Sequence, residues 1–439
     1  MEQNEKLPKV LVTCIDSWRG DVGANTLPNF FKDWDPDRIA VVYTRAEKPT
    51  LLQCNHYFQI SESEVLRSAF KFRKRVGKIV EREQENNTKS NAEEVEIEHN
   101  RINKFRNINL HIFQIARDLV WGMGSWKSPE LDAFIKDFNP DVLFFPVYPY
   151  VYMNRIQNYI AKKTKCRGVS YIADDNYSYK PEWYNPMFLI RRFFLRRTID
   201  EMIKNSDELL VILPYLKDEY KQIWKLPINV LSKGITIEEP YEQLEVCEPI
   251  KILYTGNLFI GRDKTMIKVA NTIERVNKEY GLQKFKLEIY SHIKYPDKLV
   301  SKLNIPMSSE FKGAVTVEES RRLQKEADIV LFVEGIDPFN KNKARLSFST
   351  KLTDYFKAGK CILAVGSRNI APVDYLDKNK AAIVAGNDNE LYEQLINVAK
   401  EPQLINKYAR KAYEIGLNNH SETKMNKVLQ DALIRAAHS

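Results

Sequence analysis

The sequence has no long apolar run and no clustered cysteines. None of its hydrophobic stretches approaches the about 20 residues that a membrane-spanning helix needs. Its five cysteines are far apart, without a C-x-x-C pair, so neither a zinc site of paired cysteines nor a disulfide framework is supported. The amino-terminal stretch MEQNEKLPKVLVTCID lacks the basic and apolar segments of a secretory signal. We therefore expect a cytoplasmic protein with free thiols.

Histidine is also scarce. The chain has six histidines, and none lies at a spacing typical of a metal site or a catalytic triad. The sequence therefore predicts no obligatory metal and no bound cofactor.

The chain does contain enough apolar sequence for ordinary cores, and an excess of basic residues. Hydrophobic residues make up 44% of its 439 residues, and at about 100–200 residues per domain this length indicates two folded domains. The formal net charge of +9 favours anionic partners: nucleic acid, phosphorylated small molecules or an anionic membrane surface. Charge alone does not choose among them.

Short apolar runs alternate with helical stretches in the first half of the chain. A short run rich in β-branched residues between turn signals is typical of a buried parallel strand. Such runs predict strands at Val10–Ile15, Ile39–Tyr43, Val142–Val147, Gly168–Ile172, Glu208–Leu213 and Asn229–Leu231. Strands that alternate with helices indicate βαβ units and a mostly parallel sheet.

A second α/β series follows the acidic segment 236–249, whose two prolines are typical of a linker. Its expected strands are Lys251–Tyr254, Lys286–Ser291, Ile329–Val333, Ile362–Val365 and Ala382–Val384. We thus predict an α/β protein with two facing Rossmann-like domains and a cleft between them. The expected parts are a first domain over 1–238, a linker over 239–249, a second domain over 250–418 and a final helix over 419–439.

A charged stretch at about 61–125 interrupts the first series, and we predict a helical insertion there. Over Val65–Val80, apolar residues cluster on one side of a helical wheel and basic residues take most of the other. Such a helix is compatible with an anionic bilayer, although a helix docked on the sheet has the same pattern. The basic and aromatic stretch Met187–Lys204 would suit a lipid-linked acceptor.

The segment LSFSTKLTDYFKAGKCILAVG, at 346–366, places polar residues just before a predicted helix that begins near Lys351. Ser349 and Thr350 precede this helix, whose first-turn N–H groups and positive dipole end suit a phosphate. Lys351 adds a charge, and the Asp354 carboxylate, one turn further, could accept hydrogen bonds from sugar or ribose hydroxyls. A plain helix start, with Ser349 or Thr350 as the N-cap, has the same pattern.

A second candidate is the loop in YTGNLFIGRDK, at 254–264, between a strand and a helix. Glycine lets the backbone approach a ligand, and Asn257, Arg262 and Lys264 suit a pyrophosphate. Taken alone, a basic loop with glycine is weak evidence, because ordinary connections look similar.

The order YTGNLFIGRDK, KLEIYS, FKGAVTVEESRRLQKEADIVLFV and FSTKLTDYFKAGKCILAVG resembles the C-terminal half of GT-B glycosyltransferases, especially the retaining group with an E-x(7)-E signature. The resemblance implies phosphate contacts from Asn257, Arg262 and Lys264, a nucleobase contact at Gly313, a pyrophosphate cradle from Ser349, Thr350 and Lys351, and a ribose contact from Asp354. The terminal HSETKMNKVLQDAL resembles the family's last helix, which crosses back to the first domain. The likeness covers Ile250–Leu433 well and the first half only in layout.

The signature itself is degenerate. Asp354 replaces its second glutamate, and Leu346 stands where the first is expected. Glu334 and Asp337 lie upstream in a longer loop. The acidic group that approaches the donor sugar therefore stays open, and so does the stereochemical outcome.

The first half of the chain should supply the acceptor side. Arg19, Gly20 and Gly23 follow the first strand in a loop that the resemblance places beside donor or acceptor. An ordinary flexible connection is the alternative.

Asp174 and Asp175 follow the fourth predicted strand, where a carboxylate could act as general base on an acceptor hydroxyl. Adjacent side chains usually point apart, so we expect one of them at most to act, and prefer Asp174. A turn with a helix-capping aspartate is the alternative.

These features predict a glycosyltransferase that moves a sugar from a nucleotide-sugar donor to a saccharide or lipid-linked acceptor, in cell-surface polysaccharide or glycolipid synthesis. The basic helices are compatible with peripheral contact on the inner face of the cell membrane. One alternative is a non-catalytic GT-B-like protein that binds nucleic acid or an anionic surface, and another is a sugar-nucleotide epimerase. Nucleic acid is disfavoured, since only Met187–Lys204 combines basic and aromatic residues.

Overall fold

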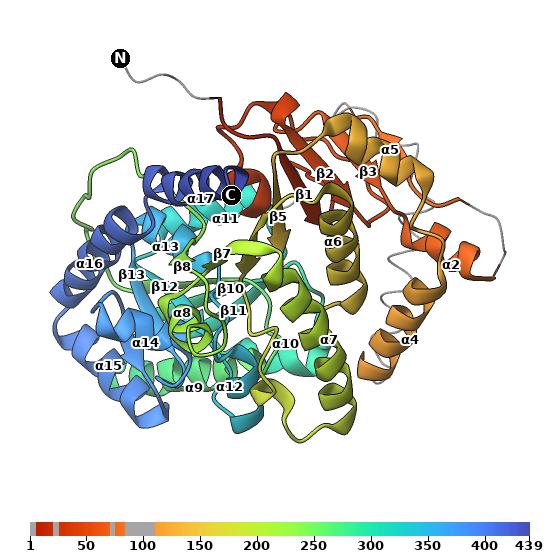
Figure 1. The fold of residues 1–439 in the computed structure, drawn as a ribbon. Coiled ribbons are helices and arrows are strands. Elements are labelled where there is room, and N and C mark those ends of the chain that lie inside the picture. The colour runs from red at the N-terminus through yellow and green to blue at the C-terminus, as the bar shows by residue number, and fades with distance from the viewer. Residues whose placement is uncertain (1–5, 21–25, 71–74, 84–109) are drawn as a thin grey trace, which may run out of the picture. The chain divides into compact units, whose positions relative to one another are not determined.

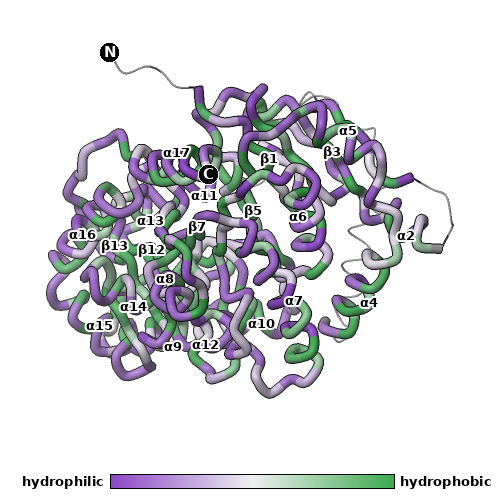
Figure 2. Tube along the Cα trace, viewed as in Figure 1, coloured by the Kyte–Doolittle hydropathy of each residue, from purple (hydrophilic) through white to green (hydrophobic). Residues whose placement is uncertain are grey.

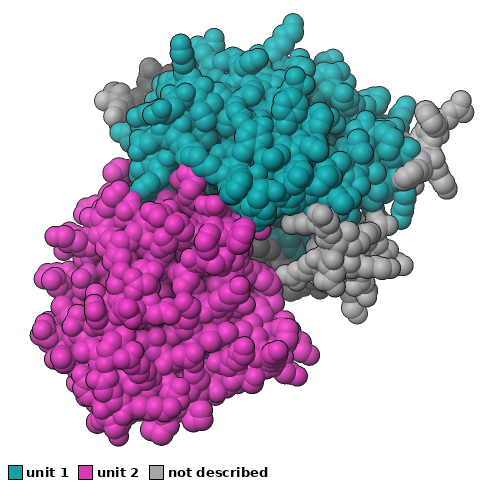
Figure 3. Space-filling model, turned by 90° about the horizontal axis from the view of Figure 1, so that it is seen from below, with its two compact units in different colours: residues 1–232, 425–439 teal, residues 233–424 magenta. Residues whose placement is uncertain are grey.

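The computed structural model describes residues 6–20, 26–70, 75–83 and 110–439. The chain divides into two compact units, drawn as a ribbon in Figure 1 and coloured separately in Figure 3. Unit 1 consists of residues 1–232 and 425–439, and unit 2 consists of residues 233–424.

Unit 1 is built on an eight-stranded sheet in the order β4-β3-β2-β1-β5-β6-β7-β8. The strands are β1 (Val10–Cys14), β2 (Ile39–Tyr43), β3 (His56–Gln59), β4 (Lys78–Val80), β5 (Val142–Pro146), β6 (Gly168–Ile172), β7 (Ser206–Val211) and β8 (Ile228–Val230). Neighbouring strands pair in parallel except β3 and β4. Every residue of β1, β2, β5 and β6 is buried, as expected for a parallel sheet covered on both faces.

Helices connect these strands, and local sequence sets several of their ends. The described helices are α1 (Thr26–Phe30), η1 (Pro36–Arg38), α2 (Glu62–Phe70), α4 (Leu110–Met123), α5 (Pro129–Phe138), α6 (Val151–Thr164), η2 (Lys180–Glu182), α7 (Pro186–Lys204), α8 (Pro214–Tyr220) and α17 (Glu422–Ala437). α5 shows the usual signals: Ser128 caps it by accepting from the Leu131 N–H, Pro129 occupies its first position, and Asn139 ends it in the left-handed conformation.

Unit 2 is built on a six-stranded parallel sheet in the order β11-β10-β9-β12-β13-β14. The strands are β9 (Ile250–Thr255), β10 (Phe285–Tyr290), β11 (Ser309–Gly313), β12 (Ile329–Val333), β13 (Cys361–Val365) and β14 (Ile383–Ala385). The helices are α9 (Arg262–Tyr280), α10 (Asp297–Leu303), α11 (Val317–Glu326), α12 (Pro338–Ala344), α13 (Lys351–Ala358), α14 (Ala371–Lys378), α15 (Asp388–Lys400) and α16 (Gln403–Asn419). Hydrophobic residues gather on the central strands (green in Figure 2), where β12 and β13 are buried throughout.

Both sheets have the strand order of a Rossmann fold. Numbered within its unit, the second sheet runs 3-2-1-4-5-6, and the first follows the same order around β1 and β5. The chain thus moves outward from β9 to β11 and then returns to add β12 on the other side of β9. In such sheets ligands bind beyond the carboxyl ends of the strands at this point of reversal.

The segment expected to be a linker, 236–249, packs on unit 2. The Asn406 side chain accepts from the Leu244 N–H and donates to the Leu244 carbonyl, at 2.7 and 2.9 Å. Tyr241 also donates to Asn406. These bonds hold the segment against α16.

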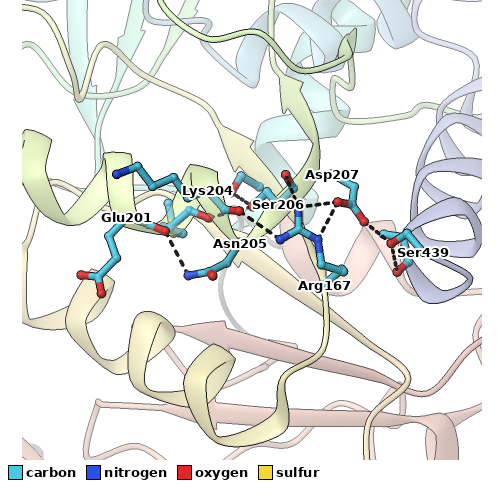
Figure 4. Close-up of polar contacts among 10 residues, drawn as sticks. Arg167, Glu201, Lys204, Asn205, Ser206, Asp207 and Ser439 are labelled. Carbon is cyan, nitrogen blue, oxygen red and sulfur yellow. Dashed lines mark hydrogen bonds and ion pairs between the residues drawn. The ribbon is translucent and has the colours of Figure 1, made fainter.

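Most of α17 belongs to unit 1, since the residues from Met425 onward lie in that unit. Its end is tied to β7: Arg435 pairs with buried Glu208 at 2.7 Å, and the Ser439 hydroxyl donates to Asp207. Figure 4 shows that Asp207 also accepts from Arg167, whose guanidinium bonds the carbonyls of Lys204 and Ser206. The chain end is thereby fixed to the start of β7.

All the predicted strands are present, but three further strands were not predicted. β3 and β4 are short, and β11 is an edge strand whose exposure alternates. The prediction of one helix over Val65–Val80 is wrong: α2 ends at Phe70, and Lys78–Val80 forms β4, antiparallel to β3. Gly77, at φ 104°, breaks any helix there. Residues 71–74, and 84–109 of the expected insertion, lie outside the described residues.

Candidate donor-binding site

The carboxyl ends of β9 and β12 carry most of the charged residues predicted for the donor. Glycines let the loops after these strands approach each other closely. A Cβ atom on Gly335 would lie 2.4 Å from the carbonyl oxygen of Ile260, and one on Gly256 would lie 1.6 Å from Lys351 Nζ. Gly261 has φ 76° at the start of α9. A larger residue at Gly335 would force the loops apart, whereas one at Gly256 would displace the Lys351 ammonium.

Arg262 and Glu334 form a two-bond ion pair in this site. Arg262 Nη2 and Nε donate to the two Glu334 oxygens at 2.8 and 3.1 Å, and Nη1 donates to Asn257 Oδ1 at 3.2 Å. The side chain of Glu334 is almost fully buried. Burial lowers the pKa of Arg262, but the charge and hydrogen bonds of Glu334 outweigh burial and raise it. Arg262 therefore remains charged, and Glu334 fixes the direction of the guanidinium.

Lys351 brings a second cation to the same place. Its ammonium lies 3.4 Å from the Tyr254 hydroxyl and 4.7 Å from the centre of the Tyr254 ring. Within the part of the chain that the structure describes, Lys351 has no ion pair with a carboxylate. Burial, and then the charge of Arg262, lower the pKa of Lys351 to about 7, although Glu334 acts in the opposite direction. We call Arg262, Glu334, Lys351 and Tyr254 the cation cluster.

The cation cluster contains two cationic side chains and one carboxylate, so it carries an excess positive charge in a partly buried place. Such a charge is costly unless an anion joins it. The start of α13 adds to this preference, because no side chain caps its first turn. Thr350 occupies the N-cap position without a capping bond, so the simple N-cap reading of Ser349 and Thr350 does not account for this segment.

Aromatic packing holds the loop before α13 in place. Phe348 stacks on His420 at a ring-centre distance of 5.7 Å, and Phe356 stacks on the same ring at 5.2 Å. The Tyr375 hydroxyl lies 3.1 Å from His420 Nε2. Burial, and to a smaller degree the charge of Lys424, lower the pKa of His420 to about 4. A neutral histidine thus forms part of the support under Ser349 and Thr350.

Asp354 pairs with a residue that the sequence did not single out. Lys233 Nζ lies 3.1 Å from Asp354 Oδ1, and the Asp354 side chain is 38% exposed. A hydroxyl group can still reach this carboxylate from the exposed side.

Lys264 and Gly313 are not members of the cation cluster. Lys264 is an exposed residue of α9. Burial alone would raise the pKa of Asp337, but the hydrogen bonds that Asn340 donates and then the charge of Lys264 lower it. Gly313 ends the edge strand β11 with φ 87°, and a Cβ there would meet open space. Two strands, β10 and β9, separate β11 from β12.

The two acids left open by the sequence both have local partners. Glu334 is committed to Arg262, and Asp337 caps α12 by accepting from the N–H and side chain of Asn340. Leu346 is buried, as its apolar character requires. Leu346 has no carboxylate, and the carboxylates of Glu334 and Asp337 already accept hydrogen bonds from Arg262 and Asn340.

The loop after β1 in unit 1 is anchored by its buried tryptophan. The carbonyl of Trp18 accepts from the N–H groups of Thr50 and Leu51, the Gly20 N–H donates to the Thr50 hydroxyl, and Arg19 donates to the Lys48 carbonyl. The described part of this loop is therefore tied to the loop after β2. Gly23, also predicted to lie on the acceptor side, falls outside the described residues.

Asp174 and Asp175 differ sharply in environment. Asp175 is buried and accepts from the Ser178 N–H and hydroxyl, at 2.9 and 2.5 Å, while its carbonyl accepts from Arg192. Asp174 is exposed just beyond the end of β6. Asp175 thus maintains the turn, whereas Asp174 is the more exposed of the two carboxylates.

Among the described residues, no group of three or more histidine, cysteine or acidic side chains is placed to hold a metal ion. Asp33 and Asp35 are separated by one residue, but both have hydrogen-bond partners: Asp35 caps η1, and Asp33 accepts from Asn426 of α17. The described helices also include none that is both long and apolar enough to cross a bilayer.

No family model matches the chain, and no curated protein matches its sequence. Solved structures do match it. Anabaena HepE in complex with UDP is 10% identical, with a TM-score of 0.61, over 97% of this chain and 100% of HepE. α,α-Trehalose 6-phosphate synthase from Burkholderia multivorans is 9% identical, with a TM-score of 0.59, over 99% of this chain and 100% of the synthase. The chain has the GT-B fold.

A further GT-B structure, a trehalose-6-phosphate protein from E. coli bound with UDP-2-fluoro glucose, is 9% identical with a TM-score of 0.58. The match covers 97% of this chain and 98% of that one. The predicted α/β class with two Rossmann-like parts is thereby confirmed. At this level of identity the likeness concerns the fold alone.

Within the GT-B fold of this chain, sequence reasoning missed three residues of the candidate site. Glu334 was noted only as an upstream acid, and Tyr254 and Lys233 were not considered. Glu334 carried one usable signal, because an acidic residue directly after a fully apolar strand lies at the ligand-binding edge of a parallel sheet. Its pairing with Arg262 had no local signal.

Proposed function

We propose that this protein is a glycosyltransferase that moves a sugar from a nucleotide-sugar donor to a saccharide or lipid-linked acceptor. The observation that carries the proposal is the cation cluster with its excess positive charge beside the uncapped start of α13. This combination suits a diphosphate. The GT-B structures similar to this chain include two with UDP or a UDP-sugar bound, which supports the same ligand class.

Each proposed residue has a defined task in the reaction. Arg262, held by Glu334 and Asn257, and Lys351 would bind the donor diphosphate and stabilise the charge that develops as the nucleotide leaves. Ser349 and Thr350 would place the α13 amides against the same phosphates. Asp354 would accept from the ribose hydroxyls.

Asp174 in unit 1 would act on the acceptor. Its carboxylate would orient the attacking hydroxyl or accept its proton. The other unit 1 residues of the proposal are Arg19, Gly20 and Gly23, which would line the acceptor loop. This division places donor binding on unit 2 and acceptor binding on unit 1.

The biological setting belongs to the same proposal. The product would be a cell-surface polysaccharide or glycolipid. A lipid-linked acceptor would bring the protein to the inner face of the cell membrane. No bound cofactor or metal enters this scheme.

Nucleotide binding is the first test. Thermal unfolding would be followed with UDP, GDP, CDP and their sugars, since a ligand at about a hundred times its Kd stabilises a protein by about 2.7 kcal/mol. We expect stabilisation by one nucleotide, with UDP first in order. The variant Arg262→Met should lose the response, whereas Lys278→Met, at an exposed position of α9, should keep it.

Two outcomes would count against transfer. If the folded protein is stabilised by none of the nucleotides, the proposed donor site is wrong. Release of a rearranged sugar without any acceptor would indicate an epimerase instead.

A further inference from the structure

Helix α7 exposes an apolar face. Ile190, Phe193 and Phe194 lie three and four positions apart, so they share one side of the helix, and each is about half exposed: 51, 47 and 51%. The opposite side is buried through residues that include Phe188, Leu195 and Ile199. Exposed phenylalanine side chains are not needed to build the core of unit 1.

The turn before α7 also exposes aromatic side chains. Trp183 is 65% exposed and lies edge-on to Tyr184, which is also exposed, with ring centres 6.1 Å apart. We call Trp183, Tyr184, Ile190, Phe193 and Phe194 the α7 apolar surface. Tryptophan and tyrosine suit a boundary between water and hydrocarbon, because each combines an apolar ring with one polar group.

The chain segment that carries the α7 apolar surface has only positive charges, with acidic residues directly before and after it. From Trp183 to Ile199 the sequence has four arginines and no acidic residue. Arg197 is exposed, and its guanidinium lies 4.8 Å from the centre of the Phe193 ring. A cation beside exposed aromatic rings fits an anionic surface with an apolar interior.

The other three arginines contact unit 1 itself. Arg196 lies 4.2 and 4.8 Å from the ring centres of Tyr177 and Tyr179. Arg191 donates to the Pro149 carbonyl and Arg192 donates to the Asp175 carbonyl, both on the buried side. Asn185 caps the start of α7. The α7 apolar surface is therefore presented by a fixed helix whose other face is committed to unit 1.

Helix α4, which packs against α7, adds further exposed apolar residues. Ile112, Leu119 and Met123 are spaced by seven and four positions, so they share one face of α4, and all three are exposed. His111 at the start of α4 bonds Glu182 of η2 at 2.8 Å, which links α4 to the turn before α7.

We propose that the α7 apolar surface, flanked by Arg197, binds an anionic lipid bilayer by inserting its aromatic side chains between the headgroups. The inference rests on the proposed transfer to a lipid-linked acceptor, because such binding would bring unit 1 to the membrane that holds this acceptor. α7 lies on the membrane and does not cross it. The interaction combines apolar insertion with a charge that salt screens.

Vesicle co-sedimentation tests the proposal on the full chain. The probes are vesicles of phosphatidylcholine alone and of phosphatidylcholine mixed with phosphatidylglycerol. We expect binding to the anionic vesicles that weakens with added salt, and at least a tenfold loss of partitioning in Phe193→Ser/Phe194→Ser. Arg197→Glu should show a smaller loss. The matched control is Leu282→Ser/Met307→Ser, which removes two exposed apolar side chains of unit 2 and should bind like the parent protein.

Three outcomes would overturn the proposal: no binding to anionic vesicles, equal binding by the double phenylalanine variant, or an equal loss in the unit 2 control. If the parent protein forms dimers and binds no vesicles, and the double phenylalanine variant is monomeric, the surface binds a second copy of the chain instead. The nucleotide response in thermal unfolding is measured on each variant. It should stay unchanged, so failure of the lipid proposal and failure of the proposed donor site remain distinguishable.

Discussion

Arg262 and Glu334 are 72 positions apart, yet they form a two-bond ion pair at the carboxyl ends of two neighbouring strands. The pair is mostly buried, with side-chain exposures of 16 and 3%. Removing one partner of such a pair leaves the other charge buried and uncompensated. The pair therefore couples the stability of unit 2 to the geometry of the candidate site.

Glu334→Gln should destabilise the protein by about 3–5 kcal/mol, because the Arg262 guanidinium loses its counter-charge in a buried place. Urea unfolding measures the change. The double variant Glu334→Leu/Arg262→Leu should recover a large part of the loss, since both charges are then absent. Equal stability of Glu334→Gln and the parent protein would contradict the role given to the pair.

Lys351→Met should have opposite effects on stability and on nucleotide binding. The pKa of the buried ammonium is depressed, so its charged form destabilises the ligand-free protein at neutral pH, and methionine should raise Tm. Loss of the charge should weaken nucleotide binding roughly tenfold or more, as expected for a charge-assisted contact of about 1.5–3 kcal/mol. Calorimetry on the same samples gives both values. A lower Tm with unchanged affinity would show that Lys351 is structural.

Nucleotide affinity should fall as the pH rises through about 7. Below that pH the Lys351 amine of the free protein is protonated and attracts the diphosphate, and above it binding must first take up a proton. The dissociation constant should then increase by up to about tenfold per pH unit. Lys351→Arg keeps its charge at every pH used, so its affinity should be nearly independent of pH in this range. If the affinity of both proteins depends on pH with the same slope, a group other than Lys351 is responsible for the pH dependence.

Stability should decrease as the pH falls from about 6.5 toward about 4. His420 is neutral in the folded protein, with a pKa of about 4. In the unfolded chain its pKa is close to 6.5, so the unfolded state takes up the proton first. This difference of two and a half units between the two pKa values corresponds to a loss of at most about 3 kcal/mol in the free energy of unfolding. His420→Phe, which keeps an aromatic ring against Phe348, should flatten this dependence in acid unfolding followed by fluorescence.

Substitutions of the two neighbouring aspartates should have different effects, one on turnover and the other on stability. Asp174→Asn should lower kcat about a hundredfold or more with little change in Tm, as expected for a general base. Asp175→Ala should lower stability by about 2 kcal/mol, because the bonds from Ser178 are lost. Steady-state kinetics with thermal unfolding on both variants makes the comparison. The reverse pattern would exchange the roles of the two residues.

The amino-acid sequence by itself determined the elements with strong local signals. Short apolar runs placed the inner strands of both sheets, because a strand buried on both faces must be apolar throughout. The start of α13 at Lys351 and its end before Gly359 were also predicted, since a polar loop and a glycine in the left-handed conformation mark a helix locally. The order of these elements was enough to predict two Rossmann-like domains, and the resemblance of the second half to GT-B glycosyltransferases implied the GT-B fold.

Tertiary structure alone decided which of the candidate residues meet. Arg262 reaches Glu334 because the sheet order places β9 beside β12, and no periodicity in the sequence encodes that neighbour. In the same way, β4 forms where a helix was predicted because Val80 pairs with Tyr57 on β3. Local patterns select helix or strand, whereas long-range pairing selects partners, and the charge of the candidate site depends on the partners.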